Sequence, residues 1–448
     1  MQLSDLKQAP VWRSDWLTIE LTPADAGRYR RVPFTLAEGQ QLLEIRPEAR
    51  AGEERKDGEG FAYKMPRPYV DITVENPQGR LVANLMARTK PVRIGEETAS
   101  PGCLPTSLEP GTWQLLVGVK ALSEDLVCRV EIRQLARQPQ LLVGETHMHS
   151  CHSDGRLTVE RLLAKAVENR LDYLILTDHN TVSGCRELVS TPELTAIPGI
   201  ELTWFSGHAN LLGLAEPVRS FFANGAAEMA DVMAEGRAAG AVVVINHPFD
   251  RTFDLAWKHS LTAFPNHLYE VWNGPYTRRN RDAVAWWQER LAEGERYRVI
   301  GGSDYHSDLD LTLGQPATAV WTWSRARADI LAALEAGHSF IMAAADSPRV
   351  SLQCGDWMMG DVALPGAGEA AAVVRIELDQ LRAGDRIEVW TAVGRSRTFT
   401  VPQGAVAFEH ELCLPVDERF CRIEVWRPDW DGEPQLATLT NPLFLQED

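Results

Sequence analysis

The first 138 residues alternate apolar and polar positions in short segments. The alternation is clearest in Leu17–Pro23, Gln41–Pro47, Tyr69–Gly79, Thr112–Ala121 and Leu126–Gln134. Turn-forming stretches such as NPQG and EPGT separate these segments. A period of two is typical of strands that bury one face. Residues 1–138 are therefore predicted to form an antiparallel, β-sandwich-like domain.

Residues 139–345 follow a different pattern, in which apolar strands alternate with helical stretches. The expected strands are Leu141–His147, Asp172–Asn180, Ala196–Trp204, His208–Leu214, Ala241–Phe249, Leu268–Gly274 and Tyr297–His306. The expected helices are Thr158–Arg170, Ala226–Gly240 and Arg278–Gly294. Such alternation predicts a mostly parallel sheet covered by helices. At this length we expect an α/β fold of the distorted TIM-like (β/α)7 barrel type, closed on itself.

Residues 346–448 again predict strands. The expected segments are Arg349–Cys354, Ala372–Leu381, Arg386–Gly394, Ser396–Val401, Ala407–Leu414 and Phe420–Pro428. The sequence RIEVW occurs twice, at Arg386–Trp390 and Arg422–Trp426, and we interpret it as two similar strands rather than an internal repeat. The chain is thus predicted to contain a barrel at 139–345 between β domains at 1–138 and 346–448.

Composition narrows the class of partner. The 448 residues carry a formal net charge of −17, which argues against a large nucleic-acid-binding surface. A small anionic substrate remains compatible with this charge, because bound metal ions can invert the local field. No oligomeric state is indicated.

The cysteines and apolar runs bear on the compartment. The seven cysteines form no C-x-x-C pair, which predicts a reducing compartment and buried free thiols. We see no signal peptide at the start and no run of about 18 apolar residues, so no membrane span is expected. A cytoplasmic protein is predicted.

Polar residues recur where the apolar strands of 139–345 end. The stretch GETHMHSCHSDG alone supplies three histidines and an aspartate. The residues at strand ends are His147, His149, Asp178, His179, Glu201, His247, Glu270, Asn273, Asp304 and His306, and His208 opens the fourth strand. The C-terminal ends of barrel strands meet at one rim, so these side chains should converge. Imidazole and carboxylate together suit Zn, Mn or Fe, and the candidates exceed what one ion needs, so two or three divalent ions are expected.

Several of these residue types also have ordinary structural interpretations. A single buried histidine with a hydrogen-bond partner is common, and His259, His267, His338 and His410 are interpreted in this way. Asp178 more often orients a neighbour or caps a helix than binds metal. Glu270 is as compatible with a salt bridge as with a position at the metal ions.

The ordered motifs resemble the polymerase-and-histidinol-phosphatase (PHP) family. The resemblance is carried by HMHSCHSDG, LTDHN, PGIE with the later GH, NHPF and GGSDYH, in that order along the middle region. The β–barrel–β order and the ending LTNPLFL are also similar to a subgroup with flanking β domains that includes carbaryl hydrolase.

The resemblance implies three metal sites. The first would use His147, His149, Glu201 and Asp304. The second would share Glu201 and add His208 and His247, and the third would use Asp154, His179 and His306.

The expected function is that of a metal-dependent hydrolase, foremost a phosphoesterase that acts on a small phosphorylated substrate through a metal-bridging hydroxide. The predicted catalytic residues are Asp304, His306 and Glu201, with Asp304 accepting the proton of the water. The predicted substrate contacts are His152, Asn180, Arg251 and Asn273. The alternatives are a carboxylic-ester or carbamate hydrolase with the same centre and a non-catalytic, metal-dependent binding protein.

Overall fold

The computed structural model describes most of the chain, in two compact units. The described residues are 1–48, 52–56, 62–66, 70–85, 90–251, 257–264, 268–309, 311–364, 371–415, 417–428 and 432–445. One unit is Ala9–Gln138, and the other joins Met1–Gln8 to Pro139–Asp448. The first eight residues thus fall outside the β domain drawn at 1–138. They include the 3-10 helix η1 (Asp5–Lys7), and they join the larger unit because Leu3 is buried there and its N–H donates to Glu377.

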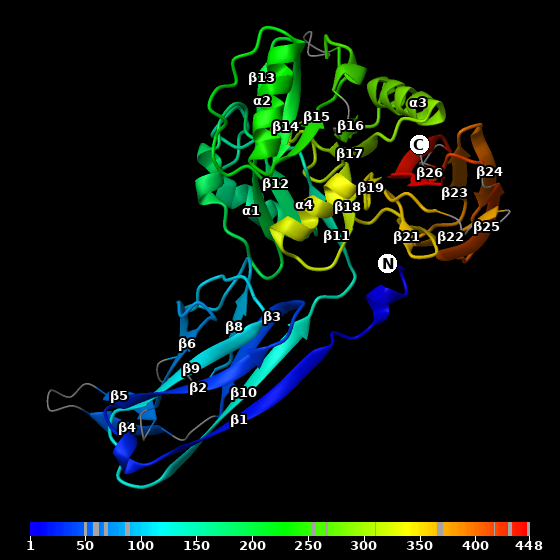
Figure 1. The fold of residues 1–448 in the computed structure, drawn as a ribbon. Coiled ribbons are helices and arrows are strands. Elements are labelled where there is room, and N and C mark those ends of the chain that lie inside the picture. The colour runs from blue at the N-terminus through cyan, green and yellow to red at the C-terminus, as the bar shows by residue number, and fades with distance from the viewer. Residues whose placement is uncertain are drawn as a thin grey trace. The chain divides into compact units, whose positions relative to one another are not determined.

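The smaller unit is a sandwich of two antiparallel sheets (Figure 1). One sheet has the order β1 (Trp12–Leu21), β10 (Leu126–Ala136), β3 (Gln40–Pro47) and β8 (Val92–Gly95). The other has the order β2 (Arg28–Leu36), β9 (Gly111–Val119), β6 (Val70–Glu75) and β7 (Leu81–Asn84), and β4 (Gly52–Lys56) pairs with β5 (Ala62–Pro66). Alternate side chains of both sheets, such as Ile19, Val130 and Leu115, share one apolar core. The predicted alternation therefore does bury one face of each sheet.

The larger unit is built on one long mixed sheet. Its first seven strands are β11 (Gln140–Glu145), β12 (Tyr173–Leu176), β13 (Thr195–Trp204), β14 (Gly207–Leu212), β15 (Val242–Ile245), β16 (Leu268–Asn273) and β17 (Arg298–Gly302). The pairs β11–β12–β13 and β15–β16–β17 are parallel, whereas β14 runs antiparallel to both β13 and β15. All seven expected strands are present, and the mixed α/β class is confirmed.

Four α-helices occur among the described residues of this unit (Figure 1). They are α1 (Val159–Glu168), α2 (Ala226–Ala238), α3 (Arg278–Glu293) and α4 (Arg327–Ala336), with short 3-10 turns η3 (Ser183–Glu187) and η5 (Leu261–Ala263). Left-handed Gly294 and Gly337 end α3 and α4, as glycine commonly does at helix C-termini. None of the described helices is long and apolar enough to cross a membrane.

The sheet curls around an inner core. Strands β11 to β18 (Ala317–Thr322) each send at least one buried side chain into a single cluster, which α4 completes with Ile330, Ala333 and Leu334. The next residues of the same strands, for example Leu174 and Leu176 of β12, pack into a separate core on the other face. Because both faces are covered, the strands are apolar throughout.

The expected closed ring differs from the observed pairing. In the described residues, β11 pairs with β18 rather than with β17, and the sheet continues through β19 (Ser339–Met342). The segments just beyond β11 and β17 nevertheless meet, because Asp304 N–H donates to His147 O and His149 N–H donates to Tyr305 O. The first and last of the seven strands therefore meet at the polar segments that follow them and not along a full ladder.

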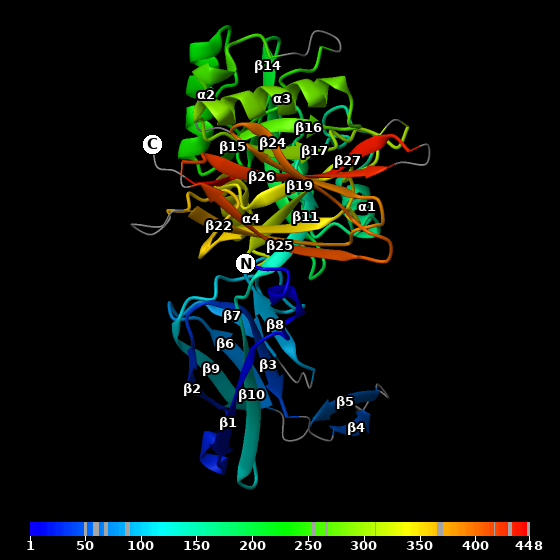
Figure 2. The same ribbon diagram turned by 90° about the vertical axis from the view of Figure 1, so that its right-hand side faces the viewer.

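The C-terminal strands extend this same sheet (Figure 2). The order after β19 is β27 (Pro434–Thr440), β26 (Phe420–Pro428), β23 (Arg386–Thr391) and β24 (Gly394–Thr400), with β28 (Leu443–Phe444) beside β26. A second sheet has the order β21 (Trp357–Met358), β20 (Arg349–Cys354), β22 (Ala371–Asp379) and β25 (Ala407–Pro415). Both sheets share a core, so residues 346–448 form a sandwich-like layer that is continuous with the preceding region.

None of the seven cysteines forms a disulfide, but they are not all buried. Cys128, Cys354 and Cys421 are buried, whereas Cys151 and Cys413 are exposed. The expectation of buried thiols is therefore wrong for these two positions.

Candidate metal centre

The end of β11 places the first pair of histidines. Its last residue, Glu145, is fully buried and accepts hydrogen bonds from the backbone N–H groups of Thr146, His147 and Ser303. This carboxylate holds the segment after β11 against the segment after β17. Burial raises the pKa of Glu145, and the hydrogen bonds from Ser303 and the backbone oppose that effect.

Glu201 is the common neighbour of the histidines. It lies near the end of β13, is fully buried, and is surrounded by imidazoles from four other segments. Its carboxylate oxygens lie 3.3 Å from His147 Nε2, 3.4 Å from His149 Nε2, 2.9 Å from His179 Nδ1, 3.2 Å from His208 Nδ1 and 3.5 Å from His247 Nε2. A fully buried carboxylate among so many ring nitrogens is typical of a ligand shared between metal ions.

Asp304 faces Glu201 from the end of β17. Its Oδ1 lies 3.0 Å from His149 Nε2, 3.3 Å from His147 Nε2 and 3.7 Å from His306 Nδ1. Asp304 and His247 have positive φ angles of 53° and 28°. Such angles are uncommon for residues other than glycine and gather at functional sites.

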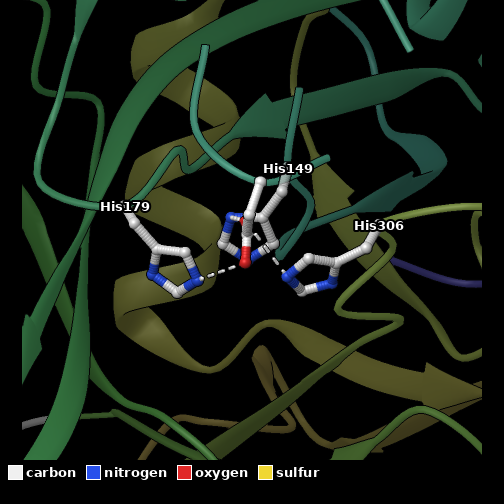
Figure 3. A group of neighbouring side chains, drawn as sticks. His149, His179 and His306 are labelled. Atoms are coloured by element: carbon white, nitrogen blue, oxygen red, sulfur yellow. Dashed lines mark ion pairs between the residues drawn. The ribbon is translucent and has the colours of Figure 1, made fainter. Parts of the chain in front are cut away.

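Asp154 forms the centre of a third group. Its carboxylate lies 3.3 Å from His306 Nε2, 3.6 Å from His179 Nε2 and 3.9 Å from His149 Nδ1. Figure 3 shows the rings of His149, His179 and His306, which come from three separate segments, around one carboxylate group. This side of the centre is the more open one, because the Asp154 side chain is 58% exposed.

All nine predicted metal ligands come together, in four overlapping groups. Within each group one potential ligand atom per residue lies within 4.8 Å of the others. The groups are His149–Asp154–His179–His306, His147–His149–Asp304, His147–Glu201–His247 and His179–Glu201–His208. They resemble the three expected sites but do not coincide with them, since His149 joins the Asp154 group and His179 joins the Glu201 group.

The electrostatics of the buried part favour charged side chains. Burial alone would raise the pKa of Glu201 and Asp304, but the neighbouring histidines hold both well below their usual values. Burial likewise opposes a charged His147, yet Asp304, Glu270 and Glu201 raise its pKa well above the usual value. The carboxylates are thus ionised and ready to accept cations.

The open side behaves in the same way. Burial opposes the ionisation of Asp154, but the hydrogen bond and charge of His306 lower its pKa to about 2. Burial would lower the pKa of His306, but Asp154 and Asp304 raise it to about 9. Carboxylates also raise the pKa of His179 and His247 against the effect of burial, whereas burial lowers the pKa of His149.

The donor set fits divalent metal ions. Within the described part of the chain, the buried ring nitrogens His147 Nε2, His149 Nδ1 and His247 Nδ1 make no hydrogen bond. Buried polar atoms without partners are costly, so native proteins seldom leave them so unless a ligand satisfies them. Six histidines and three carboxylates in one place supply the nitrogen and oxygen ligands that Zn, Mn or Fe prefer.

Two of the four predicted substrate contacts have protein partners. His152 binds Ser183 and Glu187 at the rim, with 2.9 and 3.0 Å contacts. The amide of Asn180 bonds the backbone of Thr203.

The other two predicted contacts differ sharply in burial. Asn273 is buried and bonds two carboxylates. Arg251 is exposed.

Several residues that support the centre were missed or left open by the sequence. Asn246 Nδ2 donates to Glu201, and the Thr203 hydroxyl bonds His179. Glu270 bonds His147 Nδ1 at 2.9 Å, and this contact favours the ion-pair role of Glu270 over a direct role as a metal ligand. Asp178 accepts from Ser150 N–H, Ser150 Oγ and Ser153 Oγ, so it orients the loop as expected.

The histidines interpreted as structural can be placed in part. His338 bonds Asp361, and His410 packs against Phe399 and Phe408. His267 lies outside the described residues.

Comparison with known proteins finds limited likeness. No protein-family model matches the chain. It is 36% identical over 80 residues to the 5'-3' exoribonuclease Rnm of Salmonella typhimurium and to that of Escherichia coli. Each match covers 16% of this chain and 27% of the relative, so the chain spans about a quarter of the length of these curated relatives.

Solved structures similar to the chain include PHP-like metal-dependent phosphoesterases and an amidohydrolase. A two-domain protein from Bacteroides vulgatus with a predicted PHP-like phosphoesterase is 17% identical, covers 67% of this chain and 96% of its own, and has a TM-score of 0.41. A metal-dependent phosphoesterase from Bifidobacterium adolescentis (16% identical, 38% and 92% covered) and an amidohydrolase from Chromobacterium violaceum (17% identical, 38% and 89% covered) each have a TM-score of 0.27. Sequence identities and TM-scores this low do not indicate a function, so the function is inferred from the residues of the centre.

Proposed function

We propose that the chain is a metal-dependent hydrolase that cleaves a phosphoester bond in a small anionic substrate. The observation that supports this proposal best is the convergence of six histidines and three carboxylates on Glu201, Asp154 and Asp304. Sites that only stabilise a fold commonly close around one ion with four ligands, whereas this centre is multiple and open on the Asp154 side.

The residues divide the proposed work among the ions. His147, His149, Asp304 and Glu201 would hold a first ion, Glu201 with His208 and His247 a second, and Asp154 with His179 and His306 a third. Two or three ions of Zn, Mn or Fe would supply Lewis acidity and lower the pKa of a water.

The chain's own catalytic groups are proposed to be Asp304, His306 and Glu201. Asp304 Oδ2 is held by an amide, so its Oδ1 is directed among the histidines and is the group placed to accept a proton. His306 sits on the open side with a pKa near 9, so without metal it would be protonated at neutral pH. In the metal-loaded centre it is proposed to be a neutral ligand that faces the leaving group. Glu201 keeps the histidines oriented.

A second candidate reaction is cleavage of a phosphodiester at the 5' end of RNA. The short likeness to the exoribonuclease Rnm favours it, although the net charge of −17 opposes a large nucleic-acid surface. Hydrolysis of a carboxylic ester or carbamate by the same centre is the third, and a binding protein without catalysis is the fourth.

Metal analysis followed by a substrate panel tests the proposal. The panel comprises phosphomonoesters, cyclic phosphodiesters, a 5'-phosphorylated oligoribonucleotide, aryl esters and aryl carbamates. Asp304→Ala should abolish turnover and lower bound metal, whereas His410→Ala should do neither. The phosphoesterase assignment would be overturned by a purified protein that binds no divalent metal. It would also be overturned by one that cleaves only the aryl esters or aryl carbamates.

Two further parts of the proposal concern the whole chain. We propose that β11 to β17 form a distorted (β/α)7 barrel, supported by the single core that these strands enclose. A cytoplasmic location is proposed from the sequence, and cell fractionation tests it.

A further inference from the structure

Asn273 occupies a special position between two carboxylates of the centre. It is the last residue of β16 and is buried. Its Nδ2 lies 3.0 Å from Glu270 Oε2 and 3.3 Å from Asp304 Oδ2. A single amide group therefore donates to two acidic side chains that come from different strands.

The orientation of this amide is fixed from the other side. Arg279 Nη2 donates to Asn273 Oδ1 at 3.0 Å and to Asn273 O at 3.3 Å. The guanidinium is itself paired with the buried Asp250, and Asn280 Nδ2 donates to Asn273 O. Since Arg279 can only donate, Asn273 must turn its oxygen to Arg279 and its nitrogen to the two carboxylates.

The amide occupies one oxygen of each carboxylate and leaves the other for the centre. Glu270 turns its free Oε1 to His147 Nδ1 at 2.9 Å. That hydrogen bond directs His147 Nε2 inward, where it makes no hydrogen bond among the described residues. Asp304 turns its free Oδ1 to within 3.0 Å of His149 Nε2 and 3.3 Å of His147 Nε2.

We propose that Asn273 is a positioning residue that aligns Asp304 and, through Glu270, His147 for metal binding, and that the Asp250–Arg279 pair locks its amide. This inference rests on the proposed metal-dependent function. In this proposal Asn273 supports candidate metal ligands, whereas the sequence suggested a substrate contact. Arg279, at the start of α3, is proposed to act on the centre through Asn273.

The main test replaces Asn273 by leucine, which has a similar length and branching but no donors. The apparent Kd for Zn²⁺ or Mn²⁺ is measured by competition with a chromophoric chelator. The Co²⁺-substituted protein is examined by visible absorption, which reports ligand geometry. Loss of an orienting partner typically weakens metal affinity about 10–100-fold, so Asn273→Leu should show that loss and an altered Co²⁺ spectrum.

Asn441→Leu is the matched control. Asn441 is equally buried and bonds the backbone of Val299 and Ser339 rather than a candidate ligand. It should lower the Tm of the metal-free protein and leave the Kd of the folded protein unchanged. If Asn273→Leu lowers only Tm, with wild-type Kd and Co²⁺ spectrum, it behaves like this control and the proposal is wrong.

A double substitution tests the part played by Arg279. Arg279→Met should weaken metal binding in the wild type and add little in the Asn273→Leu background, because neighbours in one network are not additive. Fully additive losses would overturn the claim that Arg279 acts through Asn273. A wild-type protein that binds no metal would instead refute the proposed function, so the two failures are distinguishable.

Discussion

Protons and metal ions compete for the same atoms in the candidate centre. Metal ligands must be deprotonated, and here the carboxylates raise the pKa of His147, His179, His247 and His306. Without metal, protons on these rings balance the charge of the buried carboxylates. Metal binding should therefore release protons and strengthen as the pH rises.

The metal-free protein should lose stability on the alkaline side because of His306. The pKa of this histidine is about 9 in the folded state against about 6.5 in unfolded chains. A raised folded pKa means that its contribution is fully present below about pH 6.5 and disappears as the pH passes 9. Thermal unfolding of chelator-treated protein between pH 6 and 10, in about half-unit steps, measures this loss. Asp154→Asn should reduce this loss, while Asp304 still raises the pKa of His306. An unchanged loss in Asp154→Asn would contradict the assigned His306–Asp154 pair.

Asp154 provides the only carboxylate of its group, so its loss should separate one metal site from the rest. We predict that Asp154→Asn keeps the fold and about two metal ions per chain but loses roughly 10²-fold or more in turnover, as expected for removal of one charge-stabilising group. Metal counting and kinetics on the same preparation measure both quantities. Wild-type turnover with one metal fewer would show the third ion to be dispensable, and loss of all metal would show that the centre does not divide in this way.

Most ligands of the centre were predictable because strand ends meet at one rim. Runs of apolar residues that stop abruptly at His, Asp or Glu indicated His147, Glu201 and Asp304. Glu145, Asn246 and Thr203 were not predictable, since one buried polar residue within or just after a strand has no recognisable period. Their roles follow from which strands lie side by side, and that is a tertiary property.

At the scale of single elements, the two RIEVW segments form an antiparallel pair with unequal burial. In the pairing of β23 with β26, Trp390 lies opposite Arg422 and Arg386 lies opposite Trp426. Arg422 is fully buried, 5.0 Å from the ring centres of Trp390 and of Trp287 in α3, and bonds Glu424 at 2.7 Å. At the equivalent position Arg386 is 38% exposed.

This pair supplies its own control for a stability prediction. Arg422→Leu should destabilise the protein by about 3–5 kcal/mol, because it leaves the buried Glu424 carboxylate without its cationic partner. Arg386→Leu should cost about 1 kcal/mol or less, since Glu388 keeps Arg395 and the site is partly solvated. Urea unfolding of both variants gives the comparison. Equal losses would mean that burial of Arg422 does not set its contribution.

Elements were more predictable than their connections. Helices α1, α2 and α3 and all seven strands up to β17 lie where periodicity placed them, but α4 was not among the expected helices. Continuation of the sheet from β18 into β19 and β27 was also unexpected. Periodicity reports which face of a strand is buried and does not report which strand pairs with its edge.

At the scale of the whole molecule, the chain leaves the larger unit and returns to it at neighbouring points. Within the sandwich, β1 pairs with β10 from Trp12 and Leu135 onward, and Ala136 N–H donates to Val11 O. Paired strands lie about 5 Å apart. The larger unit is interrupted between Gln8 and Pro139. Each of these residues is only a few positions along the chain from the bonded residues Val11 and Ala136.

This arrangement predicts that the sandwich can be removed as a unit. Met1–Gln8 joined to Pro139–Asp448 by a flexible linker of about six Gly and Ser residues, whose r.m.s. span is about 13 Å, should fold and keep the metal content of the full chain. All nine candidate ligands lie in the retained part. Pro139–Asp448 alone should have a lower Tm, because it loses the buried Leu3 and the bond from Leu3 N–H to Glu377. Metal analysis and thermal unfolding of both proteins decide the matter. If the linked protein folds but binds no metal, the sandwich contributes to the centre. Equal Tm values of the two proteins would show that Met1–Gln8 does not stabilise the larger unit.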